Sequence, residues 1–284
     1  MPLTLQRREV TAADGARLSA YVHEPRSLPA GAPTVVLAHG WVLTYRSWLP
    51  VISRLAAHGG VRVVAWDQRG HGSSTYASGS LRPQGESVRA LGSDLAAIVD
   101  QVVPAASPLT LGGHSMGGMT VMAYAGAHPS AFDGRVERVL LASTAIGGLR
   151  GPGLPLERQL MTLVTRAPGR PRRLVSVNAA RRQFGDAAEA ADVAATRAML
   201  GGARVGTYGT FFSALMQHDE SAAASTLGKV PVTVVVGRRD VLTPVKLGER
   251  VAAAIPGARL DVLDGVGHMT PYEVPDLLAS ALLP

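Results

Sequence analysis

Short apolar runs recur along the chain and alternate with segments in which apolar residues are spaced three or four positions apart. The runs are rich in β-branched residues and lack strict alternation, as expected of strands buried on both faces of a sheet. They occupy residues 34–40, 61–67, 108–115, 136–144, 230–237 and 258–264. Two earlier segments, 3–10 and 16–23, flank the turn Ala13-Asp14-Gly15 and predict an opening antiparallel hairpin.

Segments with helical periodicity lie between most of these strands. Residues 45–58 place Trp48, Ile52 and Leu55 on one helical face, and residues 86–102 repeat the pattern. Because strand and helix alternate, the sequence predicts an α/β fold with a mainly parallel twisted sheet covered on both faces.

One interval breaks this rhythm, because about 80 residues separate the strand at 136–144 from the strand at 230–237. That length is too great for a single crossover connection. The interval has its own helical period, including Tyr208, and its own Gly-Pro breakers. We therefore expect a core domain formed by residues 1–146 and 229–284, and a helical cap inserted as residues 147–228.

Composition indicates a folded chain, with 46% hydrophobic and 17% charged residues, and the absence of cysteine excludes disulfides. Arg7, Arg8 and Glu9 precede any apolar run of signal-peptide length, and no later run reaches the ~18 residues of a membrane span. We therefore expect a cytoplasmic protein without a membrane span, either a monomer or a homodimer.

The net charge of +7 comes mainly from arginine, which together with abundant alanine and glycine indicates the composition of a GC-rich genome. No nucleic-acid partner is therefore expected, although a basic field attracts polyanions. One cluster stands out, because Glu157 is the only acid between positions 150 and 185. It could be a solvated helical surface or a guide for acidic substrates. Its members are Arg150, Arg158, Arg166, Arg170, Arg172, Arg173, Arg181 and Arg182.

A candidate nucleophile lies in the motif Gly113-His114-Ser115-Met116-Gly117-Gly118, between a predicted strand and a predicted helix. A sharp strand-to-helix turn holds the serine in a strained conformation, and small residues on either side allow the close packing that it needs. The helix that follows supplies a positive dipole end near the serine. Ser115 is therefore predicted to attack an acyl carbon.

A serine hydroxyl needs a base, and the base needs a partner that orients it. Asp240 and His268 each follow a predicted parallel strand, so both are expected at the carboxyl edge of the sheet with Ser115. Asp264 is an alternative orienting residue, which we expect instead in a turn or on the surface. His39, His71 and His114 are interpreted as structural braces.

These motifs resemble those of the α/β-hydrolase superfamily, in the broad group of capped esterases, lipases, perhydrolases and C–C hydrolases. The resemblance covers nearly the whole chain and implies that the backbone amides of Trp41 and Met116 form an oxyanion hole. Its motifs are His39-Gly40-Trp41, Asp67-Gln68-Arg69-Gly70-His71-Gly72-Ser73-Ser74, Gly237-Arg238-Arg239-Asp240, and Gly267-His268-Met269 with Glu273 and Pro275.

The expected function is hydrolysis of a carboxylic ester, thioester or lactone of a small, mainly apolar substrate through an acyl-Ser115 intermediate. The same residues could serve perhydrolysis or C–C bond hydrolysis, or persist in a small-molecule binding protein. Neither a metal-ligand spacing nor a nucleotide-binding loop is present in the sequence, so no metal or cofactor is expected. The expected substrate-binding residues are Trp41, Phe211, Phe212 and Met216, although the helical stripe holding the last three could equally form the interior of the cap.

Overall fold

A computed structural model describes residues 3–151, 156–172 and 174–284, and within those ranges its central feature is an eight-stranded sheet. The strand order is β1-β2-β4-β3-β5-β6-β7-β8, antiparallel at the β1–β2 and β2–β4 pairs and parallel elsewhere. This arrangement confirms the predicted fold class. The strands are β1 Gln6–Thr11, β2 Arg17–His23, β3 Thr34–Ala38, β4 Arg62–Asp67, β5 Leu109–His114, β6 Val136–Ala142, β7 Val232–Gly237 and β8 Arg259–Leu263.

Helices cover both faces of this sheet, as the continuous apolar strands require. Side chains of α1 and α11, including Ile52 and Leu278, pack with one face of the sheet. Side chains of α2, α3 and α9, including Leu91 and Met119, pack with the other. The core helices are α1 Leu49–His58, α2 Val88–Val102, α3 Met116–Ala127, α9 Val245–Ala254, α10 Thr270–Glu273 and α11 Pro275–Leu282, with 3-10 turns η1 Tyr45–Trp48, η2 Ala77–Gly79 and η3 Pro129–Phe132.

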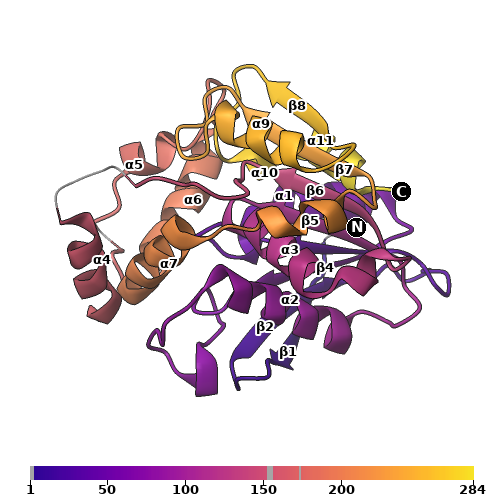
Figure 1. Cartoon of the computed structure of the whole chain (residues 1–284), viewed down its shortest axis with the longest axis horizontal. Helices are drawn as coiled ribbons and strands as arrows, with labels where there is room; N and C mark the ends of the chain where they lie inside the picture. Colours follow the sequence, from indigo (N-terminus) through magenta and orange to yellow (C-terminus); the bar gives the residue numbers. More distant parts are fainter. Residues whose placement is uncertain (1–2, 152–155, 173) are drawn as a thin grey trace.

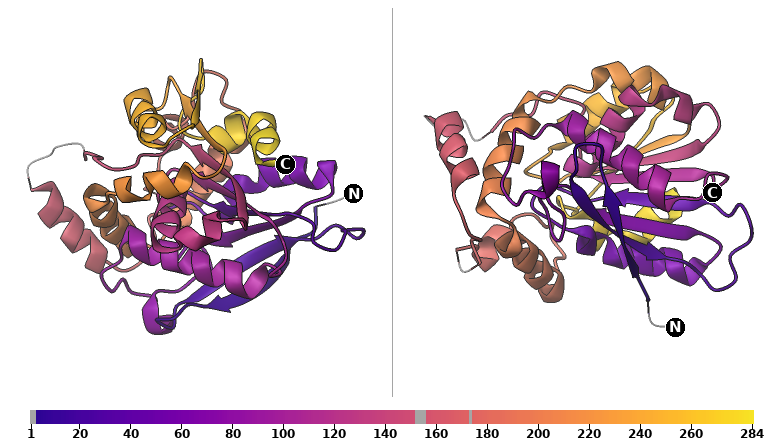
Figure 2. Two further views of the ribbon diagram at one scale, coloured as in Figure 1. Left: turned by 45° about the vertical axis from the view of Figure 1, so that its right-hand side comes forward. Right: turned by 90° about the horizontal axis from the view of Figure 1, so that it is seen from below.

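The long interval between β6 and β7 forms a group of helices at one end of the molecule (Figures 1 and 2). They are α4 Glu157–Arg166, α5 Val177–Arg181, α6 Ala190–Gly202 and α7 Val205–Gln217. An isolated bridge between Gly147 and Asp219 brings the two ends of this insertion together. The short helices that follow, η4 Ser221–Ala223 and α8 Ala224–Leu227, already contact α3 of the core. Within the described ranges, no helix has the length and apolar character needed to cross a bilayer.

A buried ion cluster ties the loop after β4 to α2. Arg69 donates through Nε to Asp94 at 2.6 Å and through Nη1 to Asp14 at 2.7 Å. The Arg69 and Asp94 side chains are almost wholly buried. Glu86, which is also buried, lies 3.2 Å from Nη1 of Arg69, so this guanidinium has three carboxylate partners, of which Asp94 is the most buried.

We expect Asp94→Asn to lower the free energy of unfolding by about 1.5–3 kcal/mol, because Arg69 loses its fully buried two-point partner while Asp14 and Glu86 remain beside it. Urea denaturation measures this change. Asp133→Asn removes a carboxylate from an exposed pair with Lys229 and should have little effect. Equal losses in the two variants would contradict the role assigned to the cluster.

Candidate active site

Ser115 occupies the sharp turn between β5 and α3, with φ 54° and ψ −120°. A side chain at positive φ is strained, and the surrounding chain must hold it there. The approach is close enough that a Cβ on Gly113 would lie 2.4 Å from the Gly117 carbonyl oxygen, and one on Gly117 would lie 2.0 Å from that of Ala38. Only glycine fits at these two positions, which explains the spacing of the motif around the serine.

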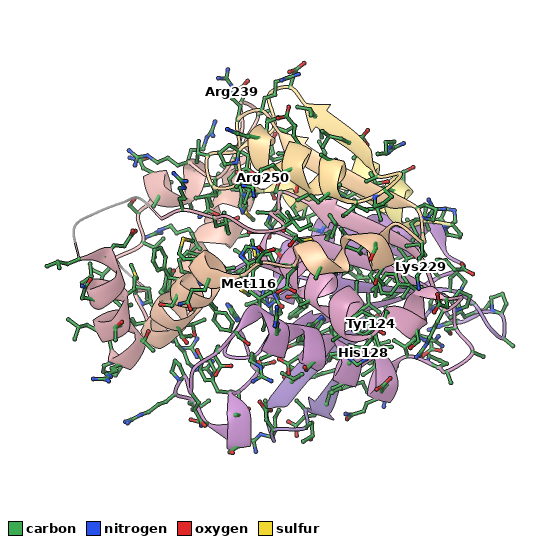
Figure 3. The ribbon with its side chains drawn as sticks, viewed as in Figure 1. Met116, Tyr124, His128, Lys229, Arg239 and Arg250 are labelled. Carbon is green, nitrogen blue, oxygen red and sulfur yellow. The ribbon has the colours of Figure 1, made fainter. Side chains whose placement is uncertain are left out.

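The backbone of Ser115 is fixed by its neighbours. Its amide donates to the Ala142 carbonyl at 2.9 Å, and the Thr144 hydroxyl donates to its carbonyl at 2.7 Å. Met116 begins α3 close to the border between core and cap (Figure 3). In the described part of the chain, no hydrogen bond uses the amide hydrogen of Met116 or of Trp41. Neither amide hydrogen is therefore engaged within the described residues.

His268 and Asp240 are in direct contact. The imidazole Nδ1 of His268 lies 2.9 Å from Oδ2 and 3.0 Å from Oδ1 of Asp240. The Thr243 amide and hydroxyl both donate to the same carboxylate at 2.8 Å. Burial by itself would raise the pKa of Asp240, but the charge and hydrogen bond of His268 and the two Thr243 donors outweigh it and lower that pKa. Asp240 therefore stays ionised and can accept the Nδ1 proton of His268.

The structure brings the predicted catalytic residues together. Ser115 and His268 line one cavity, and Asp240 contacts His268 through the Nδ1 atom of the imidazole. The alternative, Asp264, is exposed and pairs with Arg238 at 2.6 Å. It is therefore engaged on the surface, in keeping with the turn or surface role expected of it.

The other histidines near this site brace loops. His39 bonds through Nδ1 to the Gly40 carbonyl and accepts the Gln68 amide at Nε2, while His114 bonds through Nε2 to the His268 carbonyl. Burial lowers the pKa of His71 to about 4 and that of His114 to about 3. Both stay neutral near pH 7, which suits hydrogen bonding to backbone groups.

The cavity above Ser115 has a volume of about 370 Å³ and a largely apolar wall. Its lining consists of Gly40, Trp41, Val42, Leu43, Ser115, Leu174, Val175, Ala179, Gln183, Leu200, Tyr208, Leu242 and His268. The cap residues in this set come from three separate segments, and Leu242 comes from the loop after Asp240. No periodic pattern links such segments, so most of them were missed by sequence reasoning.

Of the predicted substrate-binding residues, Trp41 lines this cavity, but Phe211, Phe212 and Met216 are not among its described lining residues. Phe211 is fully buried with its ring 5.0 Å from that of His71. The Trp41 indole donates to the Thr207 carbonyl and its ring lies 6.3 Å from that of Phe212. Trp41 therefore covers Phe212, whereas Phe211 and Met216 pack with the main core, and Tyr208 from the same helix lines the cavity.

A contact that sequence reasoning missed joins the cap to the histidine loop through Glu273. Its carboxylate accepts the amide of Gly185 in the cap at 2.6 Å and that of Gly267 at 3.0 Å. Beside it, the His268 amide donates to the Gln183 carbonyl at 2.7 Å. The motif position of Glu273 after His268 was the only sequence signal. The geometry makes it a brace for the loop that carries the imidazole.

We expect Glu273→Gln to lower kcat for ester hydrolysis by about tenfold or more with little change in KM, because small displacements of a reacting group are costly. Oε2 accepts both amides, so the glutamine oxygen can take its place, but the NH₂ group then replaces Oε1, which lies 3.1 Å from the Gly267 nitrogen, and two donors face each other there. Steady-state kinetics measures the effect. Glu220→Gln is a matched control, since Glu220 is also largely buried at the end of the cap but lies beside Arg89. The two variants losing activity equally would argue against a specific role of Glu273.

Comparison with known proteins identifies a family and several related chains. A family model described as Hydrolase_4, serine aminopeptidase S33, matches residues 31–275. The monoacylglycerol lipase of Mycolicibacterium smegmatis is 34% identical over 167 residues, or 54% of this chain and 58% of that lipase. The match thus spans little more than half of the lipase. A pimeloyl-[acyl-carrier protein] methyl ester esterase of Neisseria meningitidis is 25% identical over 265 residues, or 86% of this chain and 90% of that esterase.

Among solved structures, the enol-lactonase of Burkholderia xenovorans is similar with a TM-score of 0.76 and 25% sequence identity. The likeness covers 96% of this chain and 97% of that one, so it includes most of the helical insertion as well as the sheet.

Proposed function

Starting from the fact that the chain belongs to the serine aminopeptidase S33 family of α/β hydrolases, we propose that it hydrolyses carboxylic esters through an acyl intermediate on Ser115. One observation carries the proposal. Ser115 stands at positive φ in the wall of a cavity that His268 also lines, and His268 is bonded to the buried Asp240. This arrangement is that of a serine nucleophile, its base and the group that orients the base.

The reaction has two steps, which are acylation of Ser115 and hydrolysis of the acyl-enzyme. Because ionised Asp240 accepts the Nδ1 proton of His268, Nε2 carries the lone pair and takes the proton from the Ser115 hydroxyl as Oγ attacks the ester carbonyl. The amides of Trp41 and Met116 donate to the oxyanion of the tetrahedral intermediate. The alcohol leaves with the proton from His268, and water then repeats the sequence on the acyl-enzyme to release the acid.

The cavity favours a small, mainly apolar acyl compound. Polar side chains in its wall other than Ser115 and His268 are those of Gln183 and Tyr208, within the described lining. The Tyr208 hydroxyl is already engaged, donating to the Leu200 carbonyl at 2.7 Å. Apolar contact therefore supplies most of the binding, and selection is by shape. The esterase and lactonase names of the relatives agree with an ester or lactone as substrate.

The family description also names an aminopeptidase, which is a second candidate activity. Such an enzyme must bind the α-ammonium group of a peptide, and a desolvated cation needs a carboxylate nearby. Among the described residues that line the cavity there is neither Asp nor Glu. This lining favours neutral esters over peptides with a free amino terminus.

A panel of p-nitrophenyl esters of increasing acyl length, run beside aminoacyl p-nitroanilides, tests the proposal. We expect turnover of the esters, preference for one range of acyl length, and labelling of Ser115 by a fluorophosphonate probe. Faster turnover of the anilides would instead favour the aminopeptidase. Absence of both turnover and labelling would point to a binding protein.

The cavity wall predicts a change in acyl preference. Leu200 lines the cavity from α6, so Leu200→Ala should increase kcat/KM for longer acyl chains relative to shorter ones by about tenfold, roughly the effect of one methylene in an apolar pocket. Met216→Ala is the matched control, because Met216 packs with the main core. If Met216→Ala changed the preference and Leu200→Ala did not, the cavity would be misassigned.

A further inference from the structure

Large apolar side chains on the surface are concentrated in the cap and in the loop after Asp240. In the described ranges, those that are half or more exposed are Leu81, Leu156, Leu160, Leu163, Leu174, Val177, Val241 and Leu242. Apart from Leu81, all belong to these two regions. Single exposed leucines are ordinary, but a concentration of them around one end of a protein marks an interaction surface.

Helix α4 presents three of these residues on one face. Leu156, at its N-cap, and Leu160 and Leu163 are 70%, 53% and 66% exposed, and their spacing places them within one narrow stripe. The opposite face packs on α7, where a Cβ on Gly209 would lie 2.4 Å from the Met161 carbonyl oxygen. The leucines therefore point away from the protein, and α4 lies at its outer edge (Figures 1 and 2). A surface helix normally turns its apolar stripe inward, so this outward stripe is a candidate interaction surface.

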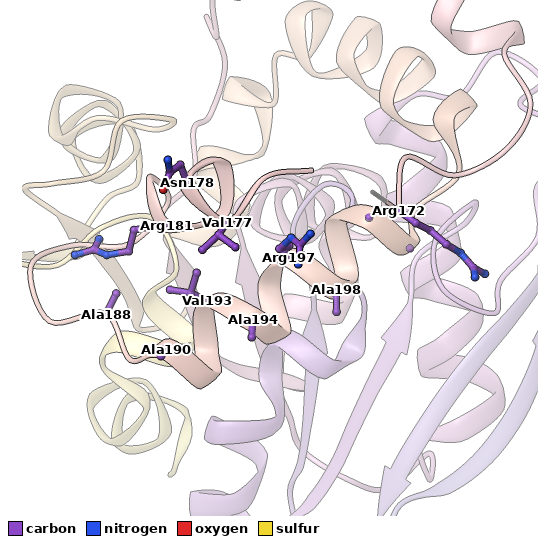
Figure 4. A pocket seen from close by; sticks show the side chains of 12 residues that line it. Arg172, Val177, Asn178, Arg181, Ala188, Ala190, Val193, Ala194, Arg197 and Ala198 are labelled. Atoms are coloured by element: carbon purple, nitrogen blue, oxygen red, sulfur yellow. The ribbon is translucent and has the colours of Figure 1, made fainter. Parts of the chain in front are cut away.

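The mouth of the Ser115 cavity has the same character. Leu174 is 86% exposed and Leu242 is half exposed, yet both also line the cavity. Next to Leu174, Val177 faces a groove between α5 and α6 together with Arg197, and Arg172 projects beyond its end (Figure 4). Exposed apolar side chains at Leu174 and Leu242 thus surround the entrance to the cavity, on the same cap that carries the α4 leucines or on the adjacent loop (Figure 1).

The cap that carries this apolar surface is rich in arginine. Most of the cap arginines lie at 150–182, where Glu157 is the only acid before Asp186, and those whose side chains the structure describes are Arg150, Arg166, Arg170, Arg172, Arg181 and Arg182. Among the described ion pairs, none involves Arg172 or Arg182. A second copy of the chain would bring the same arginines together across a symmetric interface, which is unfavourable. The partner that fits is apolar inside and anionic at its surface.

We propose that α4 and the mouth of the cavity form a docking surface for an anionic lipid aggregate. The leucines enter the boundary between headgroups and acyl chains, and the arginines pair with the headgroups. The cavity mouth then opens directly onto lipid, so an apolar ester reaches Ser115 without crossing water. Docking itself does not depend on the hydrolytic chemistry, so it can be measured separately from activity.

Sedimentation with vesicles tests the proposal. We expect the protein to sediment with phosphatidylglycerol vesicles far more than with phosphatidylcholine vesicles, and to be released by high salt. The double variant L160S/L163S should weaken binding by at least about tenfold, because it removes two apolar side chains from the contact. It should leave turnover of a water-soluble short ester unchanged, since neither residue lines the cavity. Leu81→Ser, at an exposed leucine outside this surface, is the matched control and should bind as the wild type does.

Three results would overturn the proposal. The first is a wild-type protein that does not sediment with phosphatidylglycerol vesicles. The second is equal binding by L160S/L163S and Leu81→Ser. The third is a dimer in analytical ultracentrifugation that L160S/L163S converts to a monomer, which would assign the surface to a second copy. Loss of ester turnover in Ser115→Ala with vesicle binding intact would separate docking from catalysis.

Discussion

Ser115→Ala is expected to lower kcat/KM for p-nitrophenyl esters by between about 10³- and 10⁶-fold, the range seen when a serine nucleophile is removed. The alanine keeps the Cβ, so the backbone at φ 54° bears the same strain and the turn should be retained. The lost atom is Oγ, which forms the bond to the acyl group. Kinetics, fluorophosphonate labelling and thermal unfolding of the purified variant measure these effects together.

Ser143→Ala is a closely matched control for Ser115→Ala. Ser143 is also buried, also has positive φ, at 48°, and also follows a parallel strand, β6. Its hydroxyl lies 3.5 Å from that of Thr270 and outside the cavity lining. This variant should keep both turnover and labelling. The assignment of the nucleophile would be refuted if Ser115→Ala kept wild-type ester turnover. It would also be refuted if Ser143→Ala lost turnover while Ser115→Ala did not.

Asp240→Asn should lower kcat by about 10⁴-fold, the cost measured when an orienting aspartate becomes asparagine in a serine protease. The Thr243 amide bonds to Oδ1, so asparagine would keep its oxygen there and turn its NH₂ toward His268. The imidazole would then accept at Nδ1 and carry its proton on Nε2, where it cannot take the serine proton. The fall should appear in kcat, with the fold preserved in circular dichroism.

Asp264→Asn is the control for this variant, because Asp264 lies four residues before His268 but pairs with Arg238 on the surface. We expect activity close to that of the wild type. A larger loss in Asp264→Asn than in Asp240→Asn would reverse the assignment of the orienting acid.

Local sequence determined the fold class and the candidate reactive residues. Buried parallel strands need continuous apolar runs, and these runs are visible without any knowledge of tertiary contacts. The turn at Ser115 needs glycine at 113 and 117, because a Cβ at either would collide with backbone. Asp240 and His268 could be placed beside Ser115 because parallel strands end at one edge of the sheet.

Only the tertiary structure decided which side chains form the cavity wall and which face the solvent. The period of α7 indicates an apolar stripe but not what covers it, and the indole of Trp41 covers Phe212. The leucines of α4 follow a pattern that would ordinarily predict burial, yet α4 packs on α7 through its other face. Glu273 reaches the amide of Gly185 across 88 positions of the chain. Such contacts depend on how separate elements are packed together, and packing between distant segments leaves no periodic signal in the sequence.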